Sequence, residues 1–201
     1  MGRAIVLLAV LLVAITGSSA AQSRAPEKPW VMKSRLLITG TNRSSEPDGF
    51  TTYTAFPLEV SIGRSLGGRV ALELAARSES REVDRAATPT AERLGTLELL
   101  PVSLLAQYRL GNGRLQPYLG VGGNLTVAWE KAGVLDSMEV SPSLGPALQA
   151  GVDLRLSDYL VFNADFRWNA MRTEIDAPRG PRLARLLIDA ASLGVGLGVR
   201  F

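Results

Sequence analysis

The sequence predicts an all-β protein, specifically an eight-stranded antiparallel up-and-down transmembrane β-barrel. From residue 30 onward apolar and polar side chains alternate with a period of two, which is the period of a β-strand. Along the chain, short connections between these runs alternate with long polar ones. The periplasmic turns and external loops of outer-membrane barrels alternate in the same way. No later segment offers 18 uninterrupted apolar residues, so a membrane helix is not expected.

The N-terminal segment has the parts of a secretory signal peptide. Arg3 precedes an apolar run that ends at Ile15, and small residues follow up to Ala21. The run is shorter than the roughly 20 residues that a spanning helix needs, which argues against a permanent anchor. We therefore expect a cleaved signal peptide over residues 1–21, a short periplasmic segment over 22–29 and the barrel over 30–201.

The clearest strand is predicted over residues 100–110. Leu104 and Tyr108 lie on one face of it, and Gln107 and Arg109 lie on the other. The same alternation predicts eight strands in all, over residues 30–39, 56–63, 70–77, 100–110, 115–130, 144–156, 160–169 and 187–201.

The connections between these strands differ in length in a regular way. Short turns rich in Gly, Asn, Ser or Asp are predicted near residues 64–68, 111–114 and 157–159. Longer polar loops are predicted near 40–51, 78–96, 131–142 and 176–185. A β-sandwich would have no reason for this strict alternation, which therefore favours the barrel.

Alternation does not say which face meets the surroundings, because a soluble eight-stranded barrel such as a lipocalin turns its apolar face inward. The polar face is rich in glycine, for example at Gly122, Gly151 and Gly196. Glycine weakens an open strand but relieves crowding inside a narrow barrel. Glu98 is the exception on the apolar face, and it lies next to a predicted external loop, where a charge costs little. We therefore expect the apolar face to contact lipid.

Charges of both signs lie on the predicted inner face of many strands. Buried charges must pair, and a crowded lumen would let them do so. We predict a lumen charge network made of Lys33, Arg35, Glu59, Glu73, Arg77, Arg109, Asp153, Arg155, Asp165 and Arg167.

Aromatic residues on the apolar face fall near the predicted strand ends. Such rings form girdles at the two membrane boundaries, although a core aromatic cluster is the alternative. The predicted girdle consists of Trp30, Tyr108, Trp129, Phe162, Trp168 and Phe201.

The second half of the chain carries a family resemblance in the stretches 100–108, 116–124, 145–153, 162–168 and 197–201. From about Leu99 to Phe201 these stretches resemble the OmpW family. Before it, the start with Trp30, Lys33 and Arg35 is similar. Val102 stands where the family usually has a second proline, and the loops at 40–51 and 131–142 look short for the family.

This resemblance implies an eight-stranded outer-membrane barrel regarded as a channel for small hydrophobic molecules. The ending at Phe201 is also similar to the C-terminal assembly signal of outer-membrane proteins. The implied partners are outer-membrane lipid, the assembly machinery that reads this last strand, and small hydrophobic solutes. A more generic outer-membrane barrel is the near alternative.

No enzymatic chemistry is expected. The chain has no His and no Cys, so Ser-His and Asp-His machinery cannot be built, and only a hard oxygen site could hold a metal. Carboxylates among lumen arginines are better explained as structural ion pairs. The glycines at 194–198 end a strand with no helix after it, so they do not form a nucleotide-binding loop. We expect no cofactor, and the dispersed basic residues do not favour nucleic-acid binding.

Two functions remain open from the sequence. In the first, the barrel is a narrow channel or pocket for small hydrophobic molecules. Its possible apolar pathway consists of Tyr53, Leu97, Leu99, Leu105, Tyr118, Val161, Met171 and Ile188, residues that could equally just fill space. In the second, the barrel is structural or adhesive, and ion pairs close its lumen.

Overall fold

The computed structural model describes residues 28–46, 50–54, 57–85, 92–133, 139–140, 142–176 and 182–201. The predicted signal peptide lies outside these residues. The strands are β1 (Trp30–Glu46), β2 (Phe50–Thr54), β3 (Leu58–Gly67), β4 (Val70–Arg77), β5 (Glu79–Arg85), β6 (Glu92–Arg109), β7 (Leu115–Gly133), β8 (Glu139–Val140), β9 (Ser143–Arg155), β10 (Leu160–Asp176) and β11 (Arg182–Arg200).

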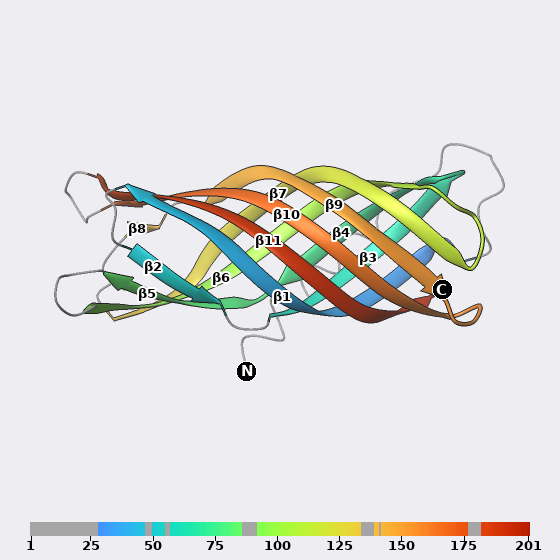
Figure 1. The fold of residues 1–201 in the computed structure, drawn as a ribbon, viewed down its shortest axis with the longest axis horizontal. Helices are drawn as coiled ribbons and strands as arrows, with labels where there is room; N and C mark the ends of the chain where they lie inside the picture. Colours follow the sequence, from blue (N-terminus) through green and yellow to red (C-terminus); the bar gives the residue numbers. More distant parts are fainter. Residues whose placement is uncertain are drawn as a thin grey trace.

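The strands close into an antiparallel barrel (Figure 1). Strand β1 pairs with β11 on one side and with β3 on the other, and the ring is completed by the β6–β7 pairing. The pairs β2/β3, β4/β5 and β8/β9 are each one barrel strand with an interruption, so the eleven segments make eight barrel strands. This confirms the predicted fold class.

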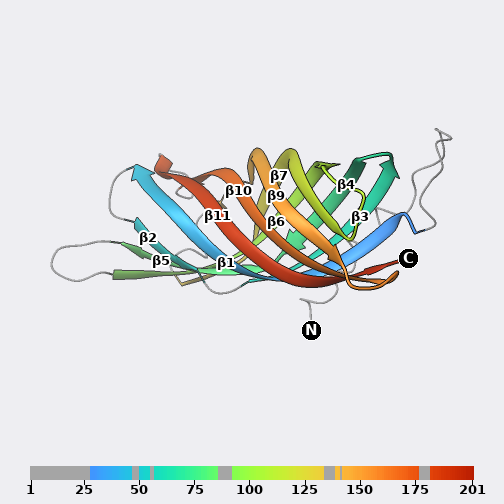
Figure 2. The same ribbon diagram turned by 45° about the vertical axis from the view of Figure 1, so that its right-hand side comes forward.

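The short turns and the C-terminus lie at one end of the barrel, and the strands wind obliquely from there to the opposite end (Figures 1 and 2). Trp30 and Phe201 exchange two backbone hydrogen bonds of 3.1 and 3.0 Å, which join the first and last strands at this end. Short turns mark the periplasmic end of a transmembrane barrel, so the opposite end is the external one.

The strands extend further outward than the sequence predicted. Much of the expected loops at 40–51, 78–96 and 176–185 is strand, because β1 continues to Glu46 and the β10–β11 hairpin reaches Asp176 and Arg182. Outside the hydrocarbon region both faces of a strand meet water, so nothing enforces the alternation on which the prediction depended.

The barrel has the reverse polarity of a soluble protein. Twenty buried residues are polar or charged and eleven are hydrophobic, among those whose side chains the structure describes. On β11, Leu193, Val195 and Leu197 are each more than half exposed on the outside. An outer surface this apolar is suited to lipid rather than water. Among the described residues, no helix is long and apolar enough to cross a membrane.

Candidate functional site

The barrel interior gathers most of the predicted lumen charges. Eight of them are buried, each at most 6% exposed: Lys33, Arg35, Glu59, Glu73, Arg77, Asp153, Asp165 and Arg167. Arg109 and Arg155 are only half-buried and lie at the periplasmic ends of β6 and β9.

Glu73 on β4 is the centre of the buried charges. Its Oε2 is 2.8 Å from Arg35 Nη2 and 3.4 Å from Lys33 Nζ, both of which come from β1. Its Oε1 is 3.3 Å from Arg167 Nη2 on β10 and accepts a 3.3 Å hydrogen bond from Gln149 on β9. A fully buried carboxylate is tolerated only when it is paired in this way.

Glu59 on β3 joins the two arginines a second time. Its Oε1 is 2.7 Å from Arg35 Nη1, and its Oε2 is 2.6 Å from Arg167 Nη1. Asp165 completes the pairing of Arg167 at 3.4 Å and accepts a 2.6 Å hydrogen bond from Gln149. Each arginine therefore contacts at least two carboxylates, an arrangement that suits its several fixed donors.

Lys33 lies at the periplasmic side of these contacts. Its Nζ is 3.0 Å from Asp153 Oδ1, and the side-chain amide of Asn163 donates to the same oxygen at 2.7 Å. Asn163 also donates to the hydroxyl of Tyr118 at 3.0 Å. We call the seven connected ionic residues the charged plug: Lys33, Arg35, Glu59, Glu73, Asp153, Asp165 and Arg167.

The charged plug crosses the lumen. Its members come from β1, β3 and β4 on one part of the ring and from β9 and β10 on another. Three cations and four carboxylates meet in direct contacts between these strands. Among the described residues, no group of carboxylates is placed to hold a metal ion.

Glycines on β11 and β9 make room for the plug. A Cβ on Gly196 would meet the carbonyl oxygen of Ser34 and would lie 2.8 Å from Arg35 Cα. One on Gly194 would lie 2.7 Å from the Asp165 carboxylate, and one on Gly151 would overlap Tyr118. Small residues on the inner face therefore let long charged side chains lie across neighbouring strands.

The residues of the predicted apolar pathway lie in different places. Leu105, Tyr118 and Val161 are buried, and Tyr118 takes part in the hydrogen bonds around the plug. Leu99 is buried on β6 toward the external end and pairs with Glu79. The side chains of Tyr53, Leu97, Met171 and Ile188 lie outside the described part of the structure.

The barrel wall has a seam beside β1. The β1–β3 ladder ends at Leu36 and Leu58, followed by one hydrogen bond from Leu37 N to Pro57 O of 3.1 Å. Beyond it β2 pairs with β5, and no pairing of β1 with β2 is found among the described residues. Ile38 is 62% exposed on the outer face just above this point, so the seam begins beside the apolar outer surface.

The profile of the OmpW family matches residues 39–201, which is most of the chain. The chain belongs to the OmpW family. This confirms the resemblance seen in the sequence, and the family members compared below are outer-membrane barrels. No match was found among curated proteins.

Solved structures of this family have the same fold. OprG from Pseudomonas aeruginosa is 20% identical with a TM-score of 0.73, and the match covers 88% of this chain and 97% of OprG. AlkL, solved in DMPC bilayers, is 18% identical with a TM-score of 0.70, covering 92% and 96%. E. coli OmpW is 18% identical with a TM-score of 0.57, covering 87% and 98%. At these identities the likeness shows the fold alone.

The predicted girdle residues of this OmpW-family chain differ in exposure. Tyr108, Phe162 and Phe201 are 48%, 38% and 55% exposed on the outer face near the periplasmic end, where Arg64 lies over the Trp30 ring at 5.1 Å. The other two members are half-buried. Trp129 is skipped where the β6–β7 register shifts and has its indole Nε1 buried, whereas Trp168 follows the regular β10 ladder.

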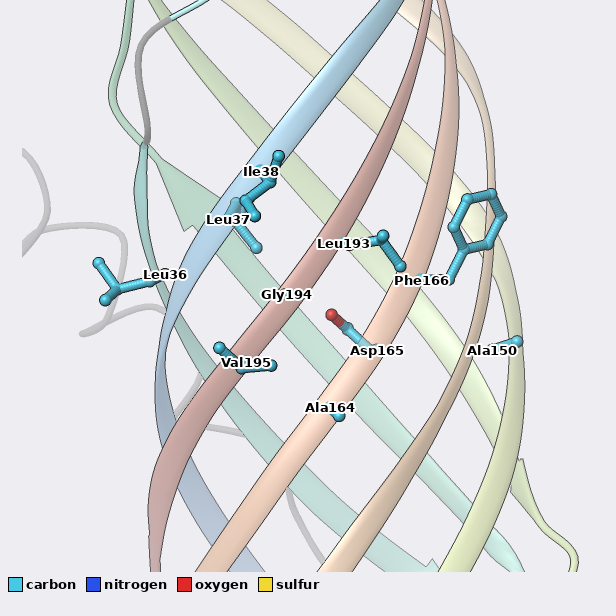
Figure 3. Close-up of a pocket in the computed structure, with 10 residues that line it drawn as sticks. All are labelled: Leu36, Leu37, Ile38, Ala150, Ala164, Asp165, Phe166, Leu193, Gly194 and Val195. Atoms are coloured by element: carbon cyan, nitrogen blue, oxygen red, sulfur yellow. The ribbon is translucent and has the colours of Figure 1, made fainter.

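The outer wall carries an apolar groove of about 730 Å³ (Figure 3). The small residues Ala150 of β9 and Ala164 of β10 are among those that line it, and the Phe166 ring points away from its centre. The lining residues are Leu36, Leu37, Ile38, Ala150, Ala164, Asp165, Phe166, Leu193, Gly194 and Val195. The groove and the seam lie on opposite sides of the same segment of β1.

Neutral members of the buried network were missing from the predicted site. Gln107 donates to Gln149 at 2.9 Å, and Asn163 donates to both Asp153 and Tyr118. All of these residues lie on the same strand face as the predicted charges, so side-chain alternation was a usable signal for them. Restricting the prediction to ionisable groups left them out.

Proposed function

We propose that this chain gives small hydrophobic molecules a sideways route from its external mouth into the outer membrane. The observation that carries the proposal is the position of the seam relative to the charged plug. On β1, the plug residues Lys33 and Arg35 lie on the periplasmic side of Leu37. The seam begins at Leu37 and continues toward the external end. A molecule that enters from outside would meet a closed lumen beneath it and an unpaired wall beside it.

Polarity supports the sideways route. Leu37 and Leu99 are buried apolar residues on the external side of the plug. On the lipid side, Leu36 and Ile38 are each 62% exposed, next to the apolar groove. Unpaired backbone groups are costly in hydrocarbon unless they line a wet cavity, so the unpaired groups of the seam are expected to face the external mouth of the lumen.

The proposal is tested by flux of a small apolar compound into liposomes that contain the purified protein. The chain has no cysteine, so Gly40→Cys on β1 and Thr54→Cys on β2 can be joined by a reducible crosslinker. We expect faster flux than in empty liposomes, loss of the excess on crosslinking and recovery on reduction. The single Gly40→Cys variant, treated with the same reagent, is the control and should keep its flux.

The dense ion pairing of the plug also favours a second function, a structural or adhesive barrel without transport. A barrel of this kind would let the compound pass no faster than empty liposomes do, with or without the crosslink. Loss of cell attachment on shortening the external ends of the β10–β11 hairpin would then support adhesion. Unchanged attachment would leave envelope support as the role.

A further inference from the structure

Arginines gather at the periplasmic mouth, away from the plug and the seam. Four barrel strands run toward this end, and three of them, β6, β9 and β11, end on an arginine. These are Arg109, Arg155 and Arg200. The residue two positions before each of them is buried on the inner face of its strand. Because side chains alternate along a strand, all three arginines are therefore directed toward the mouth of the lumen. We call them the mouth arginines.

The mouth arginines are close enough to repel one another. Arg155 is repelled by the charge of Arg109, and Arg200 is repelled by the charges of Arg155 and Arg109. The opposing charges that act on them come from Asp153, which is already 3.0 Å from Lys33 Nζ, and, for Arg200, also from Asp158. Within the described chain no carboxylate forms an ion pair with a mouth arginine.

Their donors are largely unused. Arg109 Nε is buried and has no hydrogen-bond partner in the described structure. Arg200 donates to the carbonyl oxygen of Lys28 through a long 3.4 Å contact. A buried guanidinium donor without a partner is costly, and three like charges at the mouth of a low-dielectric barrel add to that cost.

The turns at this end add more positive charge. The backbone of Arg109 bonds to that of Arg69, and the backbone of Arg155 bonds to that of Arg114, each at 2.8 Å. Both Arg69 and Arg114 are exposed on their turns. Across the three short turns, all of which the structure describes, Asp158 is the one acidic side chain.

We propose that the periplasmic mouth binds a phosphate group through Arg109, Arg155 and Arg200. Guanidinium groups present paired donors that match the oxygens of a phosphate, and an anion between them would remove their mutual repulsion. The exposed rings of Tyr108 and Phe201 adjoin Arg109 and Arg200 and set the mouth at the depth of lipid headgroups. The phosphate therefore comes from a phospholipid headgroup or from a free phosphate of the periplasm.

The test uses the full barrel in dodecyl maltoside micelles, which contain no phosphate. Inorganic phosphate is added at constant ionic strength against chloride, and the unfolding midpoint is measured. A ligand of the folded state raises the midpoint in a saturable way. We expect this in the wild type but with at least tenfold weaker apparent affinity in the Arg109→Gln, Arg155→Gln double variant. The control Arg93→Gln removes a charge from β6 at its external end and should respond as the wild type does.

A second arm adds phosphatidylglycerol to the same micelles. The headgroup is the source if this lipid stabilises the wild type but not the double variant, and if inorganic phosphate does not raise the unfolding midpoint of the wild type. The reverse result assigns a free phosphate. Equal responses of the wild type and the double variant to both probes, including no response in either, would overturn the proposal.

Removal of mutually repelling cations should not prevent folding, so the double variant is expected to form the barrel. If it does not fold, Arg155→Lys keeps the charge and loses the planar pair of donors. We then expect a severalfold weaker phosphate affinity than in the wild type, and an unchanged affinity would equally contradict the proposal. The result is independent of solute flux at the external end.

Discussion

Arg35 and Glu73 form an ion pair across strands that are not neighbours. Arg35 Nη2 on β1 lies 2.8 Å from Oε2 of Glu73 and 3.0 Å from its Oε1, although β3 lies between β1 and β4 in the sheet. Both side chains are fully buried. The contact therefore ties together parts of the barrel wall that share no backbone hydrogen bonds.

Removal of one partner of this pair should destabilise the barrel strongly. Arg35→Gln leaves the four buried carboxylates of the plug with two cations instead of three, and breaking such a pair costs about 3–5 kcal/mol. Urea unfolding of the protein in lipid vesicles measures the loss. Asp158→Asn in the exposed β9–β10 turn is the control, with an expected change within about 0.5 kcal/mol. Equal stability of both variants would show that the plug is not the buried ionic network described.

Shortening the plug should open the axis of the barrel to ions. Glu59→Ala combined with Arg167→Ala removes both sides of the 2.6 Å ion pair, so we expect a severalfold rise in single-channel conductance over the wild type. Leu148→Ala, which trims a side chain on the outer face, should leave the conductance unchanged. A wild type that already conducts like a water-filled pore would contradict closure by the plug.

The inner-face glycines should not tolerate a methyl group. Gly196→Ala places a Cβ against the Ser34 carbonyl and Arg35, so we expect a loss of about 1–3 kcal/mol of unfolding free energy, typical of overpacking. Gly113→Ala is the matched control, because a Cβ there meets nothing within 4 Å. Similar stabilities for the two alanine variants would argue against close packing of β11 on the plug.

The barrel class and the side-chain faces could be predicted because lipid on one side and a narrow lumen on the other enforce strict alternation. For this reason Lys33 and Arg35, like Asp165 and Arg167, lie two positions apart, and Glu73 and Arg77 lie four apart. The identity of each ion-pair partner could not be predicted. Arg35 reaches Glu73 as well as its ladder neighbour Glu59, because strand stagger sets the relative heights of the side chains, and stagger leaves no local sequence signal.

The external half of the molecule was harder to predict for a different reason. There the strands leave the lipid, so β5 and the outer part of β6 lose the apolar alternation and resemble a loop in sequence. The seam depends on where the β1–β3 ladder stops at Leu36 and Leu58, which is a property of the assembled sheet. Neither feature is encoded by the period of a single strand.

Charges placed on the outer face should be penalised according to depth. Val195→Arg puts a cation on the 54% exposed side of β11, within the apolar surface, and should cost about 2–4 kcal/mol. Leu110→Arg lies at the periplasmic edge and should cost about 0–1 kcal/mol. Unfolding from vesicles gives both values. Equal, small costs at the two positions would be the behaviour of a water-facing surface.

The orientation of the two strand faces is tested most directly by electrophoresis of the native protein without heating, after fractionation of the cells. A lipid-embedded barrel with a polar, ion-paired interior should sediment with the outer membrane and migrate faster before boiling than after it. Recovery in the soluble periplasmic fraction, with the same mobility before and after boiling, would contradict an apolar face that contacts lipid.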